Sequence, residues 1–324
     1  MAPNVATRRG PELSEEEVAP PAAGSAAKRP PTEIVWRSVA FFTILHILSV
    51  AGLVRALTAA RWQTLVFGLF CYCIGGVGVT AGAHRLWSHR SFSANLPLRV
   101  LLMLMYTMAG QNHIHEWVRD HRLHHRHSET DADPHDATRG FFFAHCGWLV
   151  VRKHPQVKLQ GRHTDLSDLE ADPVVMFQKR WYLPLAAVMV VGLPTLVPYL
   201  CWGESLLDAY LIAVLKYVVT LHGTWLVNSA AHMWGMHPYD RHIHPAENRS
   251  VAALAFGEGW HNYHHSFPWD YKAAELPNYT GNVTTGFIDF FHRIGWASGL
   301  KTVSADIIQR RAARNGDGSY KAPH

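Results

Sequence analysis

Four long apolar runs stand out along the chain, and each is long enough to form a helix that crosses a membrane. The hydrocarbon core of a bilayer, about 30 Å thick, takes about 20 mostly apolar residues in a helix. We therefore expect membrane spans at about residues 34–57, 62–83, 181–202 and 206–228. A fifth run, 96–109, is too short to cross at about 1.5 Å per residue, which predicts a half-buried or interfacial helix.

Short loops join these spans in pairs, so the pattern predicts two hairpins. Residues 58–61 join the first pair, and residues 203–205 join the second. Lys and Arg are concentrated in the long segments outside the hairpin loops, which the positive-inside rule places in the cytoplasm. We expect an all-α integral membrane protein with both termini in the cytosol and a cytosolic, His-rich helical cap built from residues 84–180 and 229–310.

The two ends of the chain lack an apolar period. Residues 1–33 are rich in Pro, Ala, Glu and Ser, which is typical of a disordered tail, and residues 311–324 are expected to form a C-terminal tail. One membrane domain, 34–310, is expected between them. The chain has 30 Lys and Arg against 25 Asp and Glu, a net charge of +5. The membrane topology accounts for this basic excess, so nucleic-acid binding is not expected.

Histidine is the residue type that points to chemistry, because the 23 histidines of the chain are clustered. The clusters are HRLWSH at 84–89, HRLHH at 121–125, NSAAH at 228–232 and HNYHH at 261–265. An even number of membrane crossings separates them, so all four can converge on one face of the membrane. Positions i, i+3 and i+4 share a helix face, so each HxxHH motif is expected to direct three imidazoles into the same space. The candidate metal ligands are His84, His89, His121, His124, His125, His232, His261, His264 and His265.

So many imidazoles exceed one coordination sphere, which indicates two metal ions. The four cysteines form no CxxC pair and lie outside the histidine clusters, which argues against structural zinc, iron–sulfur clusters and haem–thiolate ligation. Redox metals with nitrogen ligands and free coordination positions favour oxygen activation. On spacing alone, structural zinc and copper storage remain alternatives. Carboxylates close to the clusters are expected to orient the imidazoles, without assigned pairs. These are Asp120, Glu129, Asp131, Asp133 and Glu258.

A glycine motif in the second span needs a separate interpretation. Residues 76–81 match G-x-G-x-x-A, the pattern of dinucleotide-binding proteins. The motif lies inside an expected membrane helix with no βαβ unit around it, so its context contradicts nucleotide binding. Small residues at these positions predict close helix packing or room for a ligand.

Together these motifs resemble the membrane fatty-acyl-CoA desaturase family, of the stearoyl-CoA (Δ9) type. The resemblance covers residues from about 35 to 321 and includes GVTAGAHRLWSHRSF, EWVRDHRLHHRHSETDADPHD and GEGWHNYHHSFPWDY. It implies an endoplasmic reticulum enzyme that uses two iron ions and O2 to introduce a cis double bond, Δ9 in the first instance, into a saturated C16–C18 acyl-CoA. Electrons would come from cytochrome b5 and its NADH-dependent reductase, as separate proteins.

The resemblance also implies roles for particular residues. The nine histidines would bind iron directly, Asn228 would do so through water, and no further catalytic residue is implied. Tyr72 would close the far end of an acyl tunnel, and Gly76 would leave depth for a chain near C18. Ser38 stands where relatives commonly carry Asn near CoA. The other implied substrate contacts are Asn112, Arg119, Asp120, Arg152 and Lys153 around CoA, and Gln111, Trp117, Thr224 and Trp225 at the tunnel bend.

Several alternatives stay open at this point. A desaturase of other regiospecificity, such as Δ11, and a di-iron lipid hydroxylase would carry the same histidines. A non-enzymatic metal- or lipid-binding membrane protein is a different class, disfavoured by the intact clusters. A metal transporter would need polar ligands within the spans. Lys216 and His222 lie inside the fourth span and have no role in the desaturase scheme.

Overall fold

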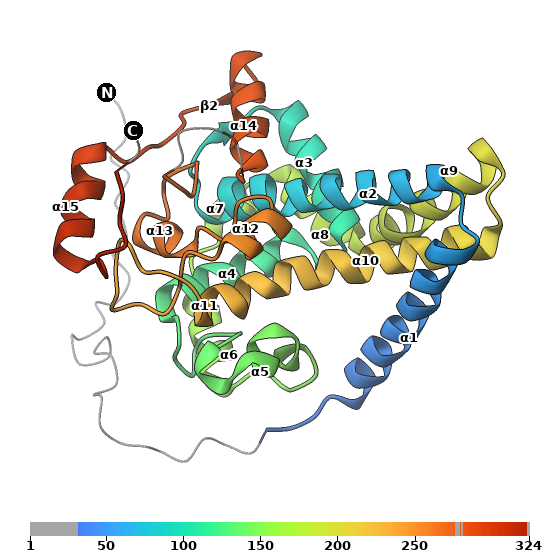
Figure 1. Ribbon diagram of the computed structural model, residues 1–324, viewed down its shortest axis with the longest axis horizontal. Helices are drawn as coiled ribbons and strands as arrows, with labels where there is room; N and C mark the ends of the chain where they lie inside the picture. The colour runs from blue at the N-terminus through green and yellow to red at the C-terminus, as the bar shows by residue number, and fades with distance from the viewer. Residues whose placement is uncertain (1–31, 276–278, 280, 323–324) are drawn as a thin grey trace, which may run out of the picture. The chain divides into compact units, whose positions relative to one another are not determined.

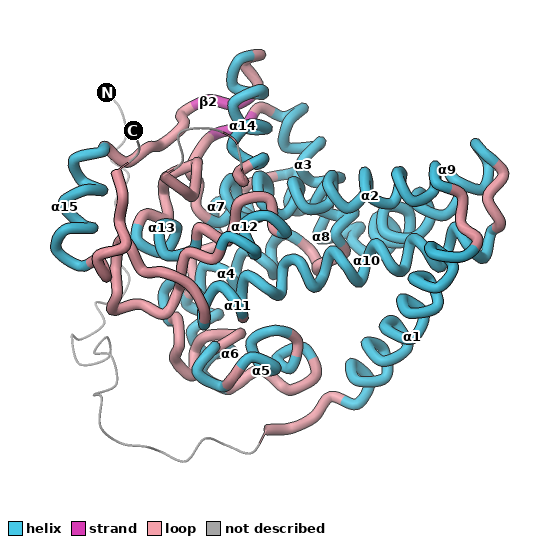
Figure 2. Tube along the Cα trace, viewed as in Figure 1, coloured by secondary structure: helices cyan, strands magenta, loops and turns pink. Residues whose placement is uncertain are grey.

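The structure is a computed structural model that describes residues 32–275, 279 and 281–322. Nearly all of the expected tail at 1–33 therefore lies outside the described residues. Within them the chain is mostly helical, and the strands are a two-residue antiparallel pair, β1 (Ser93–Ala94) with β2 (Ala297–Ser298) (Figures 1 and 2). The expected all-α class is confirmed.

Four helices are long and apolar enough to cross a membrane, which confirms the expected count for the described residues. The second continues to Ser88 through widened, π-helical turns, past the expected end at residue 83. The third, expected to begin at 181, has a kink at Trp181, where it joins a preceding helical segment. That segment begins at Pro173, because the Asp172 side chain accepts a hydrogen bond from Val174 N and caps it there. The four are α1 (Trp36–Thr58), α2 (Trp62–Val77) with η2 (Gly78–Ser88), α8 (Pro173–Ala186) with η5 (Ala187–Gly192) and α9 (Leu193–Trp202), and α10 (Leu206–Asn228) with α11 (Ala230–Met233).

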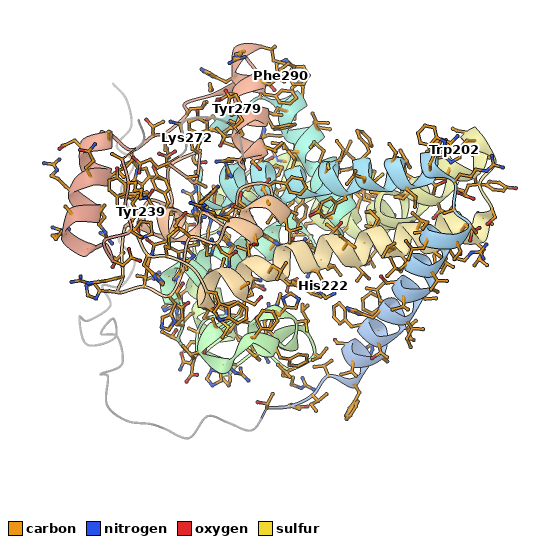
Figure 3. All side chains as sticks on the ribbon, viewed as in Figure 1. Trp202, His222, Tyr239, Lys272, Tyr279 and Phe290 are labelled. Atoms are coloured by element: carbon orange, nitrogen blue, oxygen red, sulfur yellow. The ribbon has the colours of Figure 1, made fainter. Side chains whose placement is uncertain are left out.

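Polar contacts join the two hairpins at one end. Arg55 of α1 donates to Asp208 of α10, with Nε and Oδ1 2.5 Å apart. Glu204, in the loop before α10, accepts hydrogen bonds from the backbone nitrogen of Arg61 at 2.8 Å and from the Thr64 hydroxyl at 2.6 Å. Both hairpin loops therefore lie together. The cap lies at the opposite end, as the positions of Trp202 and Tyr239 show (Figure 3).

The short apolar run forms α3 (Leu96–Ala109), which packs along the second span. Glycines make this approach possible: Gly75 faces Ala109, and Gly78 faces the backbone of Met105 and Tyr106. Because Gly75 lies about halfway along Trp62–Ser88, α3 ends at half the depth of the span. This agrees with a half-buried helix and confirms the packing role expected for part of the glycine motif.

Donors from α10 satisfy the buried end of α3 and explain Lys216. The Lys216 ammonium donates to the Met108 carbonyl at 3.3 Å, and the Tyr217 hydroxyl donates to the Gly110 carbonyl at 2.9 Å. The last carbonyls of a helix lack partners within the helix and are costly to leave unbonded in an apolar medium. A cation at this end also complements the helix dipole.

His222 joins three helices through a chain of imidazoles. Its Nε2 lies 3.1 Å from His46 Nε2 of α1, and its Nδ1 lies 2.9 Å from His145 Nε2 of α5 (Phe141–His145). His145 Nδ1 in turn lies 3.0 Å from the hydroxyl of Ser229, which follows α10. This row of hydrogen-bonded imidazoles links α1 and the cap segment at 141–145 to α10. His222 therefore has a structural role.

The cap gathers around the ends of η2 and α10 (Figure 1). The last helix continues to Asn315, beyond the boundary at 310 expected for the tail. Ala312 is buried, and Arg311 pairs with Asp240 at 2.5 Å, so this end of the chain packs on the cap. The cap helices are α4 (Ile114–His127), η3 (Ala137–Arg139), η4 (Gly147–Leu149), α6 (Pro155–His163), α7 (Ser167–Glu170), α12 (Arg249–Leu254), α13 (His261–Ser266), α14 (Val283–Arg293) and α15 (Ala305–Asn315).

Replacing Gly78 tests the contact between the second span and α3. A Cβ at this position would lie 2.2 Å from Tyr106 N and 2.3 Å from the Met105 carbonyl carbon, which are backbone atoms that cannot rotate away. We expect Gly78→Ala to destabilise the protein by about 1–3 kcal/mol, the usual cost of overpacking. Thermal unfolding of the detergent-solubilised protein measures this.

Gly68→Ala is the matched control on the same helix, because its nearest atom would be Ile212 Cγ2 at 3.5 Å, an ordinary contact. Equal unfolding temperatures for the two variants would contradict the close packing of α3.

Candidate active site

The nine candidate histidines form two sets on the inner face of the cap. Within each set, one side-chain nitrogen of every member lies within 4.8 Å of the others, close enough to hold one metal ion. The first set is His84, His89, His121, His125 and His264; the second is His124, His232, His261 and His265.

Each HxxHH motif divides between the two sets, so the expectation that three imidazoles share one space was wrong. His121 and His125 join the first set, whereas His124 joins the second. The second motif is divided the opposite way, with His264 in the first set and His261 in the second. At 3.6 residues per turn, adjacent residues point about 100° apart, so positions i+3 and i+4 diverge.

Helix ends position the remaining members. His84 lies on η2, whose wide turns finish with a bond of 3.1 Å from His89 N to the His84 carbonyl. A π-helical turn of this kind often occurs at functional sites. His232 lies on α11, the short helix that follows the fourth span. The sets therefore draw on the ends of two spans and on two cap helices.

The ring nitrogens face one another at short distances. Nε2 of His264 lies 2.9 Å from Nε2 of His84 and 3.0 Å from Nε2 of His125. In the second set, Nε2 of His261 lies 2.9 Å from Nε2 of His232 and 3.2 Å from Nε2 of His265. Nitrogens about 2.1 Å from one ion and at right angles would be about 3 Å apart, so the donor atoms suit a metal ion.

Burial keeps most of these imidazoles neutral, which is the form that binds metal. It lowers the pKa of His121, His125 and His264 well below the ordinary value, and neighbouring histidines lower it further. His124 differs: burial lowers its pKa, but the carboxylate of Asp133 outweighs burial, and the net pKa is raised.

Three carboxylates hold the outer nitrogens of three candidate ligands. Nδ1 of His84 lies 2.7 Å from Glu258 Oε2. The sequence had singled out these carboxylates but not their partners. The other two pairs are His124 Nδ1 with Asp133 Oδ1 at 2.9 Å and His232 Nδ1 with Glu129 Oε1 at 2.7 Å. Such acceptors fix the tautomer and direct Nε2 toward the metal.

Arg85 is a site residue that sequence reasoning missed. It is buried beside His84 and donates to Glu258 Oε1 at 2.9 Å. Burial raises the pKa of Glu258, but His84 and Arg85 outweigh it and lower that pKa to about 2. Its place directly after His84 in HRLWSH was the available signal. Asp120 pairs instead with Lys153 and Arg119, away from the imidazoles.

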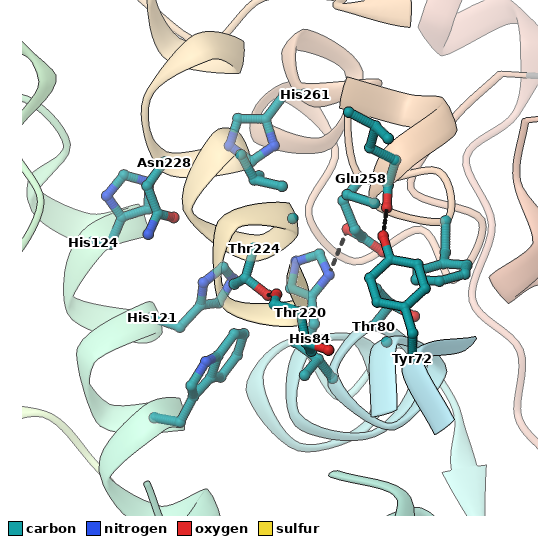
Figure 4. Close-up of a pocket in the computed structure, with 18 residues that line it drawn as sticks. Tyr72, Thr80, His84, His121, His124, Thr220, Thr224, Asn228, Glu258 and His261 are labelled. Atoms are coloured by element: carbon teal, nitrogen blue, oxygen red, sulfur yellow. Dashed lines mark hydrogen bonds and ion pairs between the residues drawn. The ribbon is translucent and has the colours of Figure 1, made fainter. Parts of the chain in front are cut away.

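A cavity runs between the second span and α10 and reaches both histidine sets (Figure 4). Its wall includes His84 and His121 of the first set and His124 and His261 of the second. Asn228, the expected ligand through water, also lines it.

Two residues that the resemblance assigned to the far end of an acyl tunnel, Tyr72 and Gly76, also line this cavity. Tyr72 donates to the Leu254 carbonyl at 2.5 Å, and Gly76 lies one turn further along α2. The space in front of Gly76 is filled, since a Cβ there would lie 2.1 Å from Phe256 Cε2. The depth expected from Gly76 is therefore occupied by an aromatic ring that sequence reasoning missed.

A second hollow shares Trp117, Thr224 and Asn228 with the wall of this cavity. Gln111 links the shared region: its side chain donates to Thr224 Oγ1 at 2.7 Å and accepts from Trp117 Nε1 at 3.2 Å. Arg119 pairs with Asp120, and Arg152 lines a neighbouring shallow hollow with Lys153. The expected substrate residues around the second hollow are Gln111, Asn112, Trp117, Asp120, Lys153, Thr224 and Trp225.

Glu258→Gln tests whether the carboxylate supports metal binding through His84. The charge that faces His84 and Arg85 is lost while the side-chain size is kept, so we expect metal affinity to fall about 10–100-fold. Metal retained against a graded chelator series, measured by elemental analysis, provides the readout. Glu170→Gln, on the exposed side of α7, is the control. Unchanged retention in Glu258→Gln would show that the pair does not support the metal.

The chain is similar to fatty acid desaturases along most of its length. The family model described as "Fatty acid desaturase" matches residues 27–280. An acyl-CoA Delta-9 desaturase of Acheta domesticus is 55% identical over 334 residues, 99% of this chain and 93% of that protein. An acyl-CoA Delta(11) desaturase of Spodoptera littoralis is 50% identical, covering 98% and 94%. A stearoyl-CoA desaturase of Homo sapiens is 49% identical, covering 96% and 87%. The chain therefore belongs to the fatty acid desaturase family.

Proposed function

We propose that this acyl-CoA desaturase introduces a cis Δ9 double bond into saturated C16–C18 acyl-CoA with two iron ions and O2. The observation that carries the proposal is a single cavity whose wall contains Tyr72 and members of both histidine sets. We propose that Tyr72, held by its bond to the Leu254 carbonyl, closes the far end. A long apolar chain in this cavity would pass the metal-binding nitrogens with its methyl end enclosed. The Δ9 relative supports the position of the double bond, and the similar Δ11 relative makes Δ11 the second candidate.

The donor set supports iron as the metal. Neutral imidazoles suit iron, zinc, copper and nickel, and the chemistry of the family selects the redox metal among them. When bound, two iron ions would supply the O2 chemistry, in which O2, two electrons from the donor, two protons and two hydrogens from neighbouring carbons give the double bond and two molecules of water. We propose the nine histidines as direct ligands and Asn228 as a ligand through water, with no further catalytic residue.

The walls of the cavity would select the carbons that react. We place a bend of the acyl path at Gln111, Trp117 and Thr224, because Trp117 and Thr224 line both the cavity and the second hollow and Gln111 bonds to both of them. An acyl chain held in one bent path presents one bond to the metals, and such positioning accounts for much of the selectivity of an enzyme. Trp225 lines the outer part of this path.

We place the CoA group at the second hollow and its outer rim. Lys153 and Arg152 supply cations for phosphate, for which arginine forms paired hydrogen bonds. Lys153 pairs with Asp120 in this structure, and Asp120 also pairs with Arg119 at 2.8 Å, so this network would orient the cations before CoA binds. Asn112 lines the same hollow.

We further propose an endoplasmic reticulum location with the cap and both termini in the cytosol. Four membrane-length helices and the concentration of Lys and Arg outside the hairpin loops support this topology. The histidine sets would then lie on the side where cytochrome b5 and its NADH-dependent reductase, as separate proteins, could deliver electrons.

Expression in yeast that lacks its own Δ9 desaturase tests the proposal. We expect new C16 and C18 monoenes with the double bond at carbon 9, located by mass spectrometry. His121→Ala removes one ligand of the first set and should abolish the product, whereas His163→Ala, at the exposed end of α6, should retain it.

Other products would change the assignment. A double bond at carbon 11 would favour the second candidate, and a hydroxylated acid would show a hydroxylase. No product from well-expressed, iron-loaded protein supplied with cytochrome b5 would refute the proposal.

A further inference from the structure

In the cavity wall beside Tyr72, a side chain at residue 76 and the ring of Phe256 would occupy the same space. The ideal Cβ of residue 76 would lie 2.1 Å from Phe256 Cε2, 2.6 Å from Cδ2 and 2.9 Å from Cζ. Only a residue without a side chain leaves room for the ring. Gly76 therefore accommodates Phe256 and adds no open depth to the cavity.

The ring of Phe256 forms the end wall together with Tyr72. Their centroids are 5.3 Å apart with the planes tilted by 44°, and both residues line the cavity. Opposite them on α10 lie Thr220 and Gly223, and a Cβ on Gly223 would lie 3.4 Å from the Tyr72 hydroxyl. A chain that extends along α10 from the histidines reaches these two aromatic rings.

The backbone around Phe256 is held from two sides. Its carbonyl accepts a hydrogen bond of 2.9 Å from Thr284 Oγ1 of α14, which lies 2.8 Å from Thr80 Oγ1 of η2. Two residues earlier, the Leu254 carbonyl accepts from Tyr72. Phe256 has a φ of 55°, a conformation that is rare for a large side chain and persists only where its surroundings fix it. The backbone that carries the ring is thus held in place.

We propose that Phe256 is a specificity-determining residue that sets the longest acyl chain the protein accepts, with Gly76 providing its space. This inference rests on the proposed function, because it assigns the cavity to the acyl chain. The bond that reacts lies near the histidines, whereas Phe256 lies at the closed end, so the wall should control chain length without moving the double bond. One methylene in an apolar pocket typically changes discrimination about 10–200-fold.

Binding and turnover of saturated C14 to C20 acyl-CoAs by the purified iron-loaded protein test this. Binding is followed by thermal stabilisation, and turnover by competition with NADH, cytochrome b5 and its reductase. Phe256→Ala should favour longer chains, with the C20 to C16 ratio rising at least about tenfold in both measurements. The double-bond position should stay that of the unmodified protein. Phe290→Ala, an exposed phenylalanine on α14, should change neither.

Variants at residue 76 provide the coupled test. In Gly76→Ala the methyl group displaces the ring into the cavity, so shorter chains should be favoured. In Gly76→Ala/Phe256→Ala the methyl group enters vacated space, so the length preference should differ from the sum of the single changes, as expected for residues in contact. Phe256→Leu is the milder variant if Phe256→Ala fails to fold.

The outcomes separate the two proposals. Length preferences in folded Phe256→Ala or Phe256→Leu that equal those of the unmodified protein would overturn the role of Phe256, whatever the turnover. A shift in the length dependence of binding without any unsaturated product would support the role of Phe256 and count against the proposed reaction.

Discussion

The burial of nine imidazoles at the boundary between membrane and cap is the constraint on which the rest of the structure depends. Buried polar groups are costly unless each has a partner. Here Glu258, Asp133 and Glu129 hold the outer nitrogens of three histidines, and Arg85 in turn neutralises Glu258. The inner nitrogens converge in two sets, where metal ions would complete the arrangement. The spans, α3 and the cap together position these groups.

The half-depth helix connects this polar centre to the lipid-facing spans. α3 enters along the glycine face of the second span and ends beside Gly75, where donors from α10 satisfy its last carbonyls. The chain then turns back as α4, which carries three of the histidines. The same glycine run supplies both close packing, at Gly78, and the space for Phe256, at Gly76. One span therefore contributes to the histidine sets, the contact with α3 and the wall of the cavity.

The sequence predicted the features that depend on composition and periodicity: four spans, a short half-buried helix and the ligand candidates. It did not predict that the three histidines of each HxxHH motif divide between the two sets. Positions i+3 and i+4 lie on broadly the same helix face, but adjacent side chains still point about 100° apart. Pairs such as Glu258 with His84 join residues 174 positions apart, which no local pattern encodes. Phe256 escaped notice because a single aromatic residue outside a motif carries no signal until Gly76 is seen facing it. The last described helix extends beyond the expected boundary at 310 because its residues, such as Ala312, pack on the cap.

The central claim is that the two histidine sets hold two iron ions. Anomalous X-ray scattering on either side of the iron absorption edge, from crystals of protein purified without added metal, tests it most directly. The account predicts two iron peaks, one among His84, His89, His121, His125 and His264, and the other among His124, His232, His261 and His265. A single peak, or peaks that do not strengthen on crossing the iron edge, as zinc or copper would give, would contradict it.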